Sequence, residues 1–315
     1  MKIVILEPIG LSNEELEERL GPLSDHDIDM YDSIAKSPEE MIQRAQTADI
    51  LVIANTPLTK EVIEACPSLK MISVAFVGID HIAQDICKER NIIISNSANY
   101  CTHAVAELAL GLTISVLRNI PRCDDATRAL ETKQGLVGHE LYQKTFGLVG
   151  MGAIGCQVAK LALAFGCRVI AYNRSENPTM KALGVEYISL ENLMSQSDIV
   201  SVHVPLTPDT RHLIAASQID MMKPSAILIN TARGPIVDQA YLAQALKANK
   251  IAGAGIDVFD QEPALTKDEA LIYENTAVLT PHVAYATKES ILRRGQIVID
   301  NIIAYLEDKP QNVML

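Results

Sequence analysis

The sequence predicts an α/β protein built from two doubly wound parallel sheets. Short, unbroken apolar runs rich in Ile and Val alternate with helical patterns along almost the whole chain. Such runs are typical of parallel strands that are buried on both faces. The chain has 315 residues, which favours about two domains. The alternation stops near Thr102 and starts again at Thr145, so we expect one sheet before this break and one after it.

Four apolar runs predict the strands of the first sheet, at residues 2–6, 49–55, 70–76 and 91–95. Helices are predicted between them at residues 13–20, 37–42 and 59–65. The second of these helices has Ser37 as its N-cap and Pro38 at its first helical position, and acidic residues follow in the first turn. The first hundred residues therefore form a small α/β unit.

Residues 102–117 are apolar on nearly all sides, so this helix should be buried or lie at an interface. Residues 119–143 are polar and predict a surface helix and loop.

Six strands are predicted in the second sheet, at residues 145–150, 167–173, 198–204, 226–230, 252–258 and 277–282. Helices are predicted between them, ending at Phe165 or spanning residues 190–196, 217–222 and 239–248. The long helical pattern at 287–307 has no sheet of its own, so we expect it to return to the first domain. The expected domains are 1–99 plus 284–315, which is discontinuous, and 100–283.

Composition disfavours several classes of function. The formal charge of −12 disfavours nucleic acid as a partner. The apolar run at the N-terminus is too short for a signal peptide, and no run of 18 apolar residues predicts a membrane span. The six cysteines include no C-x-x-C pair or metal-type cluster. We therefore expect a cytoplasmic protein without a metal site or a membrane partner.

A glycine motif predicts a dinucleotide site in the second domain. Gly150, Gly152 and Gly155 form G-x-G-x-x-G, with Ala153 and Ile154 between the last two, after an apolar strand and at the start of a helix. These glycines permit a tight turn, close approach of pyrophosphate and close packing of the helix on the strand. A plain packing turn is the alternative.

The end of the second strand of this unit favours NADP(H) over NAD(H). An acidic residue there would bind the ribose 2′-hydroxyl and repel a 2′-phosphate. This chain instead has Asn173, followed by Arg174 and Ser175, and the latter two can bind a phosphate. The alternative is a solvated Arg174 beside an ordinary NAD ribose.

Three residues at strand ends suit hydride transfer to a 2-keto acid. Arg233, Glu262 and His282 each follow a strand of the second sheet, and substrates bind beyond the carboxyl ends of such strands. The guanidinium can grip a carboxylate, and the imidazolium can donate a proton while the acid orients it. Purely structural roles, and His203 as a competing histidine, remain open at this point.

These segments together resemble the D-isomer-specific 2-hydroxyacid dehydrogenase family. The motifs that carry the resemblance are VGIDHI (77–82), VAELALGL (105–112), GLVGMGAIG (147–155), VHVPLTPDTRHLI (202–214), LINTARGPIVD (228–238), GIDVFDQEP (255–263) and PHVAYAT (281–287). The resemblance implies Rossmann-like and flavodoxin-like domains, with the discontinuous domain binding substrate. It also implies a homodimer, with the helix from Thr102 near the interface.

The resemblance also implies residue roles. Arg233 matches the residue that orients substrate, Glu262 the acidic partner and His282 the acid/base. The amides of Val77 and Gly78 would bind the substrate carboxylate, and Tyr285 would contact substrate. The further predicted cofactor-binding residues are Val204, Pro205, Thr231, Ala232 and Asp257, the last of them near the nicotinamide amide.

Departures from the family narrow the expected substrate. Members that act on 3-phosphoglycerate carry arginines in the segment that reads Ile53-Ala54-Asn55-Thr56 here, so a phosphorylated substrate is not expected. The chain has no Trp, and Phe76, Tyr100 and Tyr285 are candidates for an apolar pocket or for ordinary core. We expect glyoxylate, hydroxypyruvate, pyruvate or a branched analogue.

Three alternatives accompany this prediction. The same enzyme could use NAD(H). A nucleotide-sensing interaction protein similar to transcriptional co-repressors would bind nucleotide without turnover. A formate dehydrogenase is disfavoured by Glu262, because the family's formate enzymes have a different partner beside the histidine.

Overall fold

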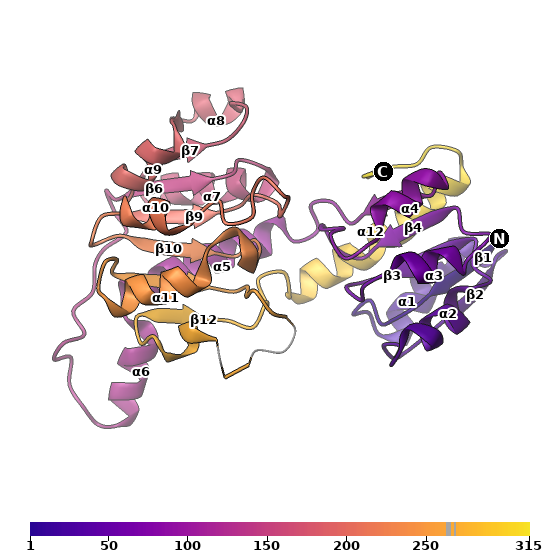
Figure 1. The fold of residues 1–315 in the computed structure, drawn as a ribbon, viewed down its shortest axis with the longest axis horizontal. Coiled ribbons are helices and arrows are strands. Elements are labelled where there is room, and N and C mark those ends of the chain that lie inside the picture. Colours follow the sequence, from indigo (N-terminus) through magenta and orange to yellow (C-terminus); the bar gives the residue numbers. More distant parts are fainter. Residues whose placement is uncertain (263–265, 268) are drawn as a thin grey trace. The chain divides into compact units, whose positions relative to one another are not determined.

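The computed structural model describes residues 1–262, 266–267 and 269–315. The chain forms two compact units (Figure 1). Unit 1 comprises Met1–Cys101 and Ala286–Leu315, and unit 2 comprises Thr102–Tyr285. Each unit contains one sheet, and every strand pairing in both sheets is parallel. The predicted class, two doubly wound parallel sheets, is confirmed.

The sheet of unit 1 has five strands in the order β2-β1-β3-β4-β5, which is the flavodoxin-like order. The strands are β1 Lys2–Ile5, β2 Asp27–Met30, β3 Ile50–Ile53, β4 Met71–Val74 and β5 Ile93–Asn96. The helices are α1 Asn13–Leu20, α2 Pro38–Ala45, α3 Lys60–Glu64, α4 Gln84–Glu89 and α12 Lys288–Leu306.

The sequence prediction missed β2 and α4 of unit 1. The prediction found β3 and β4 because all their residues are apolar or small and buried. In contrast, β2 is an edge strand that reads DIDM and buries no residue fully. Its acids are paired with the Nζ atom of Lys2, at 3.0 Å from Asp27 and 2.6 Å from Asp29. An edge strand with acids at alternate positions lacks the apolar run on which the prediction depended.

The C-terminal segment packs into unit 1. The hydroxyl of Ser73 on β4 donates to the carbonyl oxygen of Val298 on α12 at 3.2 Å. The chain beyond α12 then runs antiparallel to β5, where the amide of Met314 donates to the carbonyl oxygen of Ile94 at 2.8 Å.

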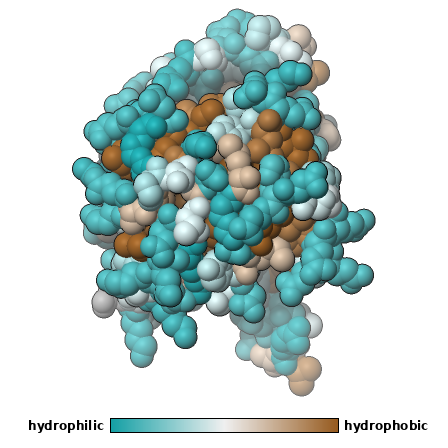
Figure 2. All heavy atoms as spheres, turned by 90° about the vertical axis from the view of Figure 1, so that its right-hand side faces the viewer, coloured by the Kyte–Doolittle hydropathy of each residue, from teal (hydrophilic) through white to brown (hydrophobic). Residues whose placement is uncertain are grey.

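The face of the molecule seen in Figure 2 is mostly hydrophilic, with apolar side chains gathered between the polar ones.

The sheet of unit 2 has seven strands in the order β12-β11-β10-β9-β6-β7-β8, and Figure 1 shows most of them stacked in this order. The strands are β6 Thr145–Val149, β7 Arg168–Tyr172, β8 Glu186–Tyr187, β9 Ile199–Val202, β10 Ile227–Asn230, β11 Gly253–Ile256 and β12 Ala277–Leu279. The helices are α5 Thr102–Leu117, α6 Ile120–Arg128, α7 Ala153–Ala164, α8 Pro178–Ala182, α9 Leu190–Gln196, α10 Ala216–Asp220 and α11 Gln239–Lys247.

Strand order reverses between β6 and β9, which is where doubly wound sheets bind their ligands. The core divides into two clusters, one with α5 and α7 and the other with α9, α10 and α11. The sequence prediction missed β8, which has two residues, and the one-turn helix α8.

Helix α5 spans the residues predicted for it, and half of its residues are buried. It packs against α7 and against strands β10, β11 and β12. Among the described residues, no single helix is long and apolar enough to cross a membrane. Helices α5 and α6, bent by 58°, pass that test only as a pair.

Candidate active site

The turn between β6 and α7 has the geometry of a phosphate-binding loop. Gly150 has a φ of +103°, in the left-handed region that favours glycine. A Cβ atom at Gly155 would lie 2.1 Å from the carbonyl oxygen of Gly150, so glycine allows α7 to begin close to the strand. Apart from chain neighbours, no described residue lies within 4 Å of the position of a Cβ atom at Gly152. The space beside the N-terminus of α7, where Ala153 and Ile154 lie, is therefore open to a phosphate.

The other predicted cofactor-binding residues follow strands at the same edge of the sheet. Those after β7 are Asn173, Arg174 and Ser175, those after β9 are Val204 and Pro205, and those after β10 are Thr231 and Ala232. The Oγ1 atom of Thr231 is buried and has no hydrogen-bond partner among the described residues. An orphaned hydroxyl at this edge, together with the open glycine turn, fits a bound dinucleotide.

Asn173 links the glycine turn to the segment that follows β7. Its Oδ1 atom accepts a hydrogen bond from the amide of Met151 at 3.2 Å, and its Nδ2 atom donates to the carbonyl oxygen of Ser175 at 2.7 Å. Arg174 and Ser175 are exposed. The amide side chain therefore shapes the segment that presents these two residues, and the first residue after β7 is this asparagine and not an acid.

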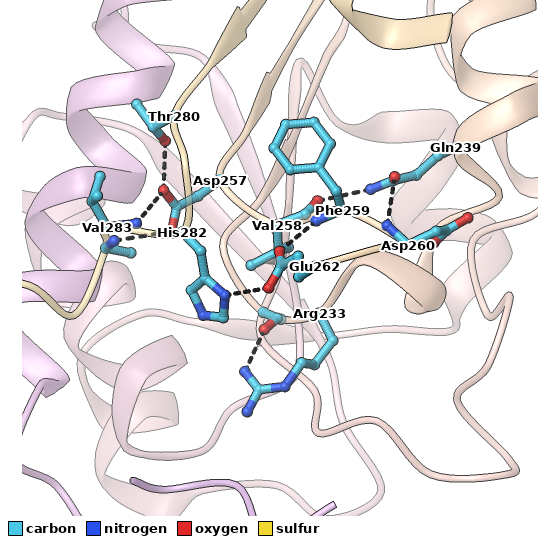
Figure 3. A network of polar contacts seen from close by, with 12 residues as sticks. Arg233, Gln239, Asp257, Val258, Phe259, Asp260, Glu262, Thr280, His282 and Val283 are labelled. Carbon is cyan, nitrogen blue, oxygen red and sulfur yellow. Dashed lines mark hydrogen bonds and ion pairs between the residues drawn. The ribbon is translucent and has the colours of Figure 1, made fainter. Parts of the chain in front are cut away.

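His282 and Glu262 form a direct pair (Figure 3). The Nδ1 atom of His282 lies 2.5 Å from Oε2 of Glu262, and each side chain is about a quarter exposed. The amide of Phe259 donates to Oε1 of Glu262 at 2.7 Å. Burial raises the pKa of Glu262, but hydrogen bonds from His282 and Phe259 and the charges of His282 and Arg233 outweigh burial, so the pKa lies below its usual value. Glu262 therefore faces the imidazole as a carboxylate at neutral pH.

The backbone at His282 is held by the buried carboxylate of Asp257. His282 has a φ of +52°, which is uncommon for a residue with a Cβ atom. Oδ1 of Asp257 accepts from the Thr280 hydroxyl at 2.6 Å and from the Val283 amide at 2.9 Å, while Oδ2 accepts from the Ala284 amide at 2.9 Å. These three donors fix the turn that carries the imidazole. Desolvation raises the pKa of Asp257, and the hydrogen bonds oppose this effect only in part.

Arg233 is presented by a turn that Asn230 and Gly234 define. Nδ2 of Asn230 donates to the carbonyl oxygen of Arg233 at 2.9 Å, and Oδ1 of Asn230 accepts from the Ala232 amide at 3.0 Å. A Cβ atom at Gly234 would lie 2.1 Å from the carbonyl carbon of Phe259, so glycine allows the two loops to touch. Figure 3 shows the guanidinium on the side of the His282 ring that faces away from Asp257.

The structure brings Arg233, Glu262 and His282 together from the ends of the adjacent strands β10, β11 and β12. Pro263, the last residue of the motif that contains Glu262, lies outside the described residues. The described residues include no group of three or more His, Cys, Asp or Glu side chains that could hold a metal ion.

The competing histidine, His203, packs beneath the glycine turn. A Cβ atom at Gly150 would lie 2.7 Å from its backbone carbonyl, and its Nε2 atom lies 2.8 Å from the hydroxyl of Ser201. Burial lowers the pKa of His203 to about 4. This ring is therefore neutral near pH 7 and is a poor source of protons.

The predicted substrate-binding residues lie in both units. Val77 and Gly78 follow β4 of unit 1, and Val77 is 38% exposed. Tyr285 in unit 2 makes an edge-to-face contact with the His282 ring, with 5.8 Å between centroids. Phe76 and Tyr100 are buried in unit 1, 8% and 1% exposed, and the Arg294 guanidinium lies over both rings.

The sequence prediction did not anticipate the residues that hold this constellation in place. The carboxylate of Asp257, a residue predicted to lie near the nicotinamide amide, accepts hydrogen bonds from Thr280, Val283 and Ala284 and so supports the turn at His282. Thr280 and Asn230 were not singled out at all. The only available signal was their position, since Asn230 lies in the motif at 228–238 and Thr280 lies in the predicted strand at 277–282, directly before the motif at 281–287.

The family model for the NAD binding domain of D-isomer specific 2-hydroxyacid dehydrogenases matches residues 110–284, which is more than half of the chain. The chain belongs to this family. It is therefore an NAD(P)-dependent oxidoreductase, and unit 2 contains the matched domain.

This 2-hydroxyacid dehydrogenase is similar over most of its length to curated relatives. It is 38% identical over 310 residues to a glyoxylate reductase of Korarchaeum cryptofilum, covering 95% of this chain and 93% of the relative. It is 39% identical over 274 residues to a hydroxypyruvate reductase of Thermotoga maritima, covering 85% and 88%.

Solved structures show the same fold. An acyclic imino acid reductase in complex with NADPH and D-Arg matches with a TM-score of 0.92 and 33% identity, over the whole of both chains. A glyoxylate reductase from Paecilomyes thermophila matches with a TM-score of 0.90 and 28% identity, covering 100% of this chain and 98% of the other.

Proposed function

We propose that this dehydrogenase reduces a small 2-keto acid, such as glyoxylate or hydroxypyruvate, to the D-2-hydroxy acid, with His282 as the proton donor. The observation that carries the proposal is the 2.5 Å contact between Nδ1 of His282 and Glu262, with Arg233 at the neighbouring strand end. The proposed substrates agree with the names of the relatives, which include glyoxylate and hydroxypyruvate reductases.

The proposed reaction divides the work among three side chains. Reduced nicotinamide supplies the hydride when the cofactor is bound. His282 holds a proton on Nε2, since Nδ1 faces Glu262, and gives it to the oxygen of the substrate carbonyl. The Glu262 carboxylate stabilises the imidazolium and fixes the ring. The Arg233 guanidinium binds the substrate carboxylate through two parallel hydrogen bonds and polarises the adjacent carbonyl. In the reverse direction neutral His282 accepts the proton.

We propose that unit 1 binds the substrate carboxylate through the amides of Val77 and Gly78, and that Tyr285 contacts the substrate. An unphosphorylated substrate is supported by the segment after β3. The buried carboxylate of Glu7, 4% exposed, accepts hydrogen bonds from the amides of Ala54 at 2.8 Å and Thr56 at 3.1 Å. A carboxyl group, and not a cation, thus lies beneath this segment, which disfavours a phosphate there.

We also propose a homodimer with α5 near the interface. Support comes from large apolar side chains of unit 2 that are exposed, among them Leu130 at 93% and Val137 at 85%. A cytoplasmic location, and the lack of nucleic-acid and membrane partners, stay predictions from composition.

NADP(H) is the proposed preferred cofactor. Arg174 and Ser175 are exposed after β7, and the position where an acid would bind the ribose 2′-hydroxyl is occupied by Asn173. Replacing Arg174 by alanine should raise the KM for NADPH by about tenfold, since one charge-assisted hydrogen bond to phosphate is lost. The KM for NADH should change little. Initial rates with both nucleotides at saturating keto acid measure the two effects.

Arg168→Ala is the matched control for this prediction. Arg168 begins the same strand, and its Nη2 atom pairs with Glu186 at 2.7 Å. This variant makes the same change in charge at the opposite end of β7, so it should leave the ratio of the two KM values unaltered. Equal effects of Arg174→Ala on NADPH and NADH would refute a role in binding the 2′-phosphate.

A further inference from the structure

The segment that follows β4 is tied to the end of β5 through its carbonyl groups. The hydroxyl of Ser97 donates to the carbonyl oxygen of Val74 at 2.9 Å. The amide of Ser97 donates to the carbonyl oxygen of Phe76 at 2.9 Å. The side chain of Asn96 completes the set, because its Nδ2 atom donates to the carbonyl oxygen of Val77 at 2.7 Å. The peptide planes on both sides of Val77 are thereby held by residues 96 and 97.

This arrangement decides where two amide groups point. In a trans peptide the N–H group points opposite to the C=O group of the same plane. Because the carbonyl groups of Phe76 and Val77 are directed at residues 96 and 97, the N–H groups of Val77 and Gly78 are directed away from them. Neither of these two N–H groups has a hydrogen-bond partner in the described part of the chain. Val77 is exposed and Gly78 partly so, which leaves the pair of donors open to an anion.

Asn96 is itself held firmly. It is 3% exposed, its amide donates to the carbonyl oxygen of Asn312 at 3.0 Å, and its carbonyl oxygen accepts from Nδ2 of Asn301 at 2.9 Å. Nδ2 of Asn312 in turn donates to Oδ1 of Asn301 at 2.8 Å. The chain beyond α12 and α12 itself thus fix the backbone of Asn96 from two sides.

The buried amide of Asn96 is used only as a donor. Its Oδ1 atom is buried and has no hydrogen-bond partner among the described residues. A buried acceptor without a partner destabilises the fold, so its retention calls for a reason. The hydrogen bond to the carbonyl oxygen of Val77 supplies such a reason, because it sets the direction of the Gly78 N–H group.

We propose that Asn96 is a positioning residue, which orients the peptide planes around Val77 so that the N–H groups of Val77 and Gly78 bind the carboxylate of the 2-keto acid. This inference rests on the proposed function. It predicts that loss of the donor on Asn96 weakens binding of the carboxylate and leaves proton transfer from His282 intact.

Asn96→Asp tests the proposal, because aspartate has the same shape but its ionised form has no donor. The KM for glyoxylate should rise by roughly tenfold, while kcat and the KM for NADPH stay within about twofold of the wild type. A buried carboxyl that faces a carbonyl oxygen has a raised pKa, and its protonated form regains a donor. The ratio of the variant KM to the wild-type KM should therefore decrease as the pH is lowered from about 8 to about 5.5.

Ser73→Ala is the control for a merely structural effect. In the wild type the hydroxyl of Ser73 donates to the carbonyl oxygen of Val298, so this variant, like Asn96→Asp, loses a buried side-chain hydrogen bond in unit 1. It should lower the melting temperature without changing the KM for glyoxylate. The proposal is overturned if Asn96→Asp leaves that KM unchanged, or if Ser73→Ala raises it to the same extent.

Binding of oxamate, a carboxylate analogue of the substrate, separates this inference from the proposed function. Calorimetry on the NADP⁺-loaded and NADPH-loaded protein measures it without turnover. Weaker binding by Asn96→Asp than by the wild type supports the inference even if no keto acid is reduced. Equal binding of oxamate by the wild type and Asn96→Asp overturns the inference, while keto-acid turnover by the wild type still supports the proposed function. A wild type that neither binds oxamate nor reduces a keto acid contradicts both the inference and the proposed function.

Discussion

Replacing His282 by alanine should lower kcat for keto-acid reduction by about three orders of magnitude, since a positioned acid typically contributes 10²–10⁴-fold. The imidazole is the proposed proton donor, and its Nδ1 atom lies 2.5 Å from Oε2 of Glu262. Affinity for NADPH should stay close to that of the wild type, because the glycine turn lies at other strand ends. Steady-state kinetics and a fluorescence titration with NADPH measure the two quantities separately. Normal turnover by this variant would remove His282 from the mechanism.

Glu262→Gln distinguishes the roles within the pair. The pKa of Glu262 lies below its usual value, so the wild-type carboxylate is ionised across the neutral range and stabilises the imidazolium. Glutamine keeps the size of the side chain but removes the charge. The alkaline limb of the profile of kcat/KM against pH should therefore move to lower pH by roughly one to two units. An unmoved limb would show that Glu262 does not stabilise the charged ring.

Replacing Arg233 by lysine should raise the KM for the keto acid by about a hundredfold, because a point charge cannot reproduce two parallel hydrogen bonds to a carboxylate. The fall in kcat should be smaller, since the proton donor is untouched. The turn that presents residue 233 should survive, because Asn230 holds its backbone and not its side chain. Initial rates over a range of glyoxylate concentrations at saturating NADPH give both constants.

Arg128→Lys is the control for Arg233→Lys. Arg128 is an exposed arginine on α6 whose Nε atom pairs with Asp124 at 2.7 Å. Its replacement should leave both kinetic constants unchanged. If Arg233→Lys behaves like this control, Arg233 does not grip the substrate.

Much of the fold follows from local sequence pattern. Strand β3 is an unbroken apolar run and β10 is apolar up to Asn230, because every residue of both strands is buried, and burial of this kind leaves a clear signal. Strands β2 and β8 leave no such signal, since one is a half-exposed edge with alternating acids and the other has two residues. The prediction failed where packing against a neighbouring strand, and not composition, decides the structure.

The members of the candidate site were predictable in part for the same reason. Arg233, Glu262 and His282 each end a recognisable strand, and the carboxyl ends of adjacent parallel strands meet at one edge. The residues that support them were not predictable. Asp257 reaches Val283 across 26 positions, and Asn96 reaches Val77 across 19. Hydrogen bonds of this separation depend on the assembled sheet, and no local pattern of residues announces them.

Rates of NADPH and NADH oxidation with glyoxylate, hydroxypyruvate, pyruvate and 2-ketoisocaproate, followed by chiral analysis of the product, would decide whether this dehydrogenase reduces 2-keto acids. We expect turnover of at least one keto acid to the D-2-hydroxy acid, with kcat/KM about tenfold higher for NADPH than for NADH. A higher value with NADH would discard the interpretation of Arg174 and keep the enzyme. Measurable binding of nucleotide without turnover of any of these acids would contradict the claim and favour a nucleotide-sensing protein.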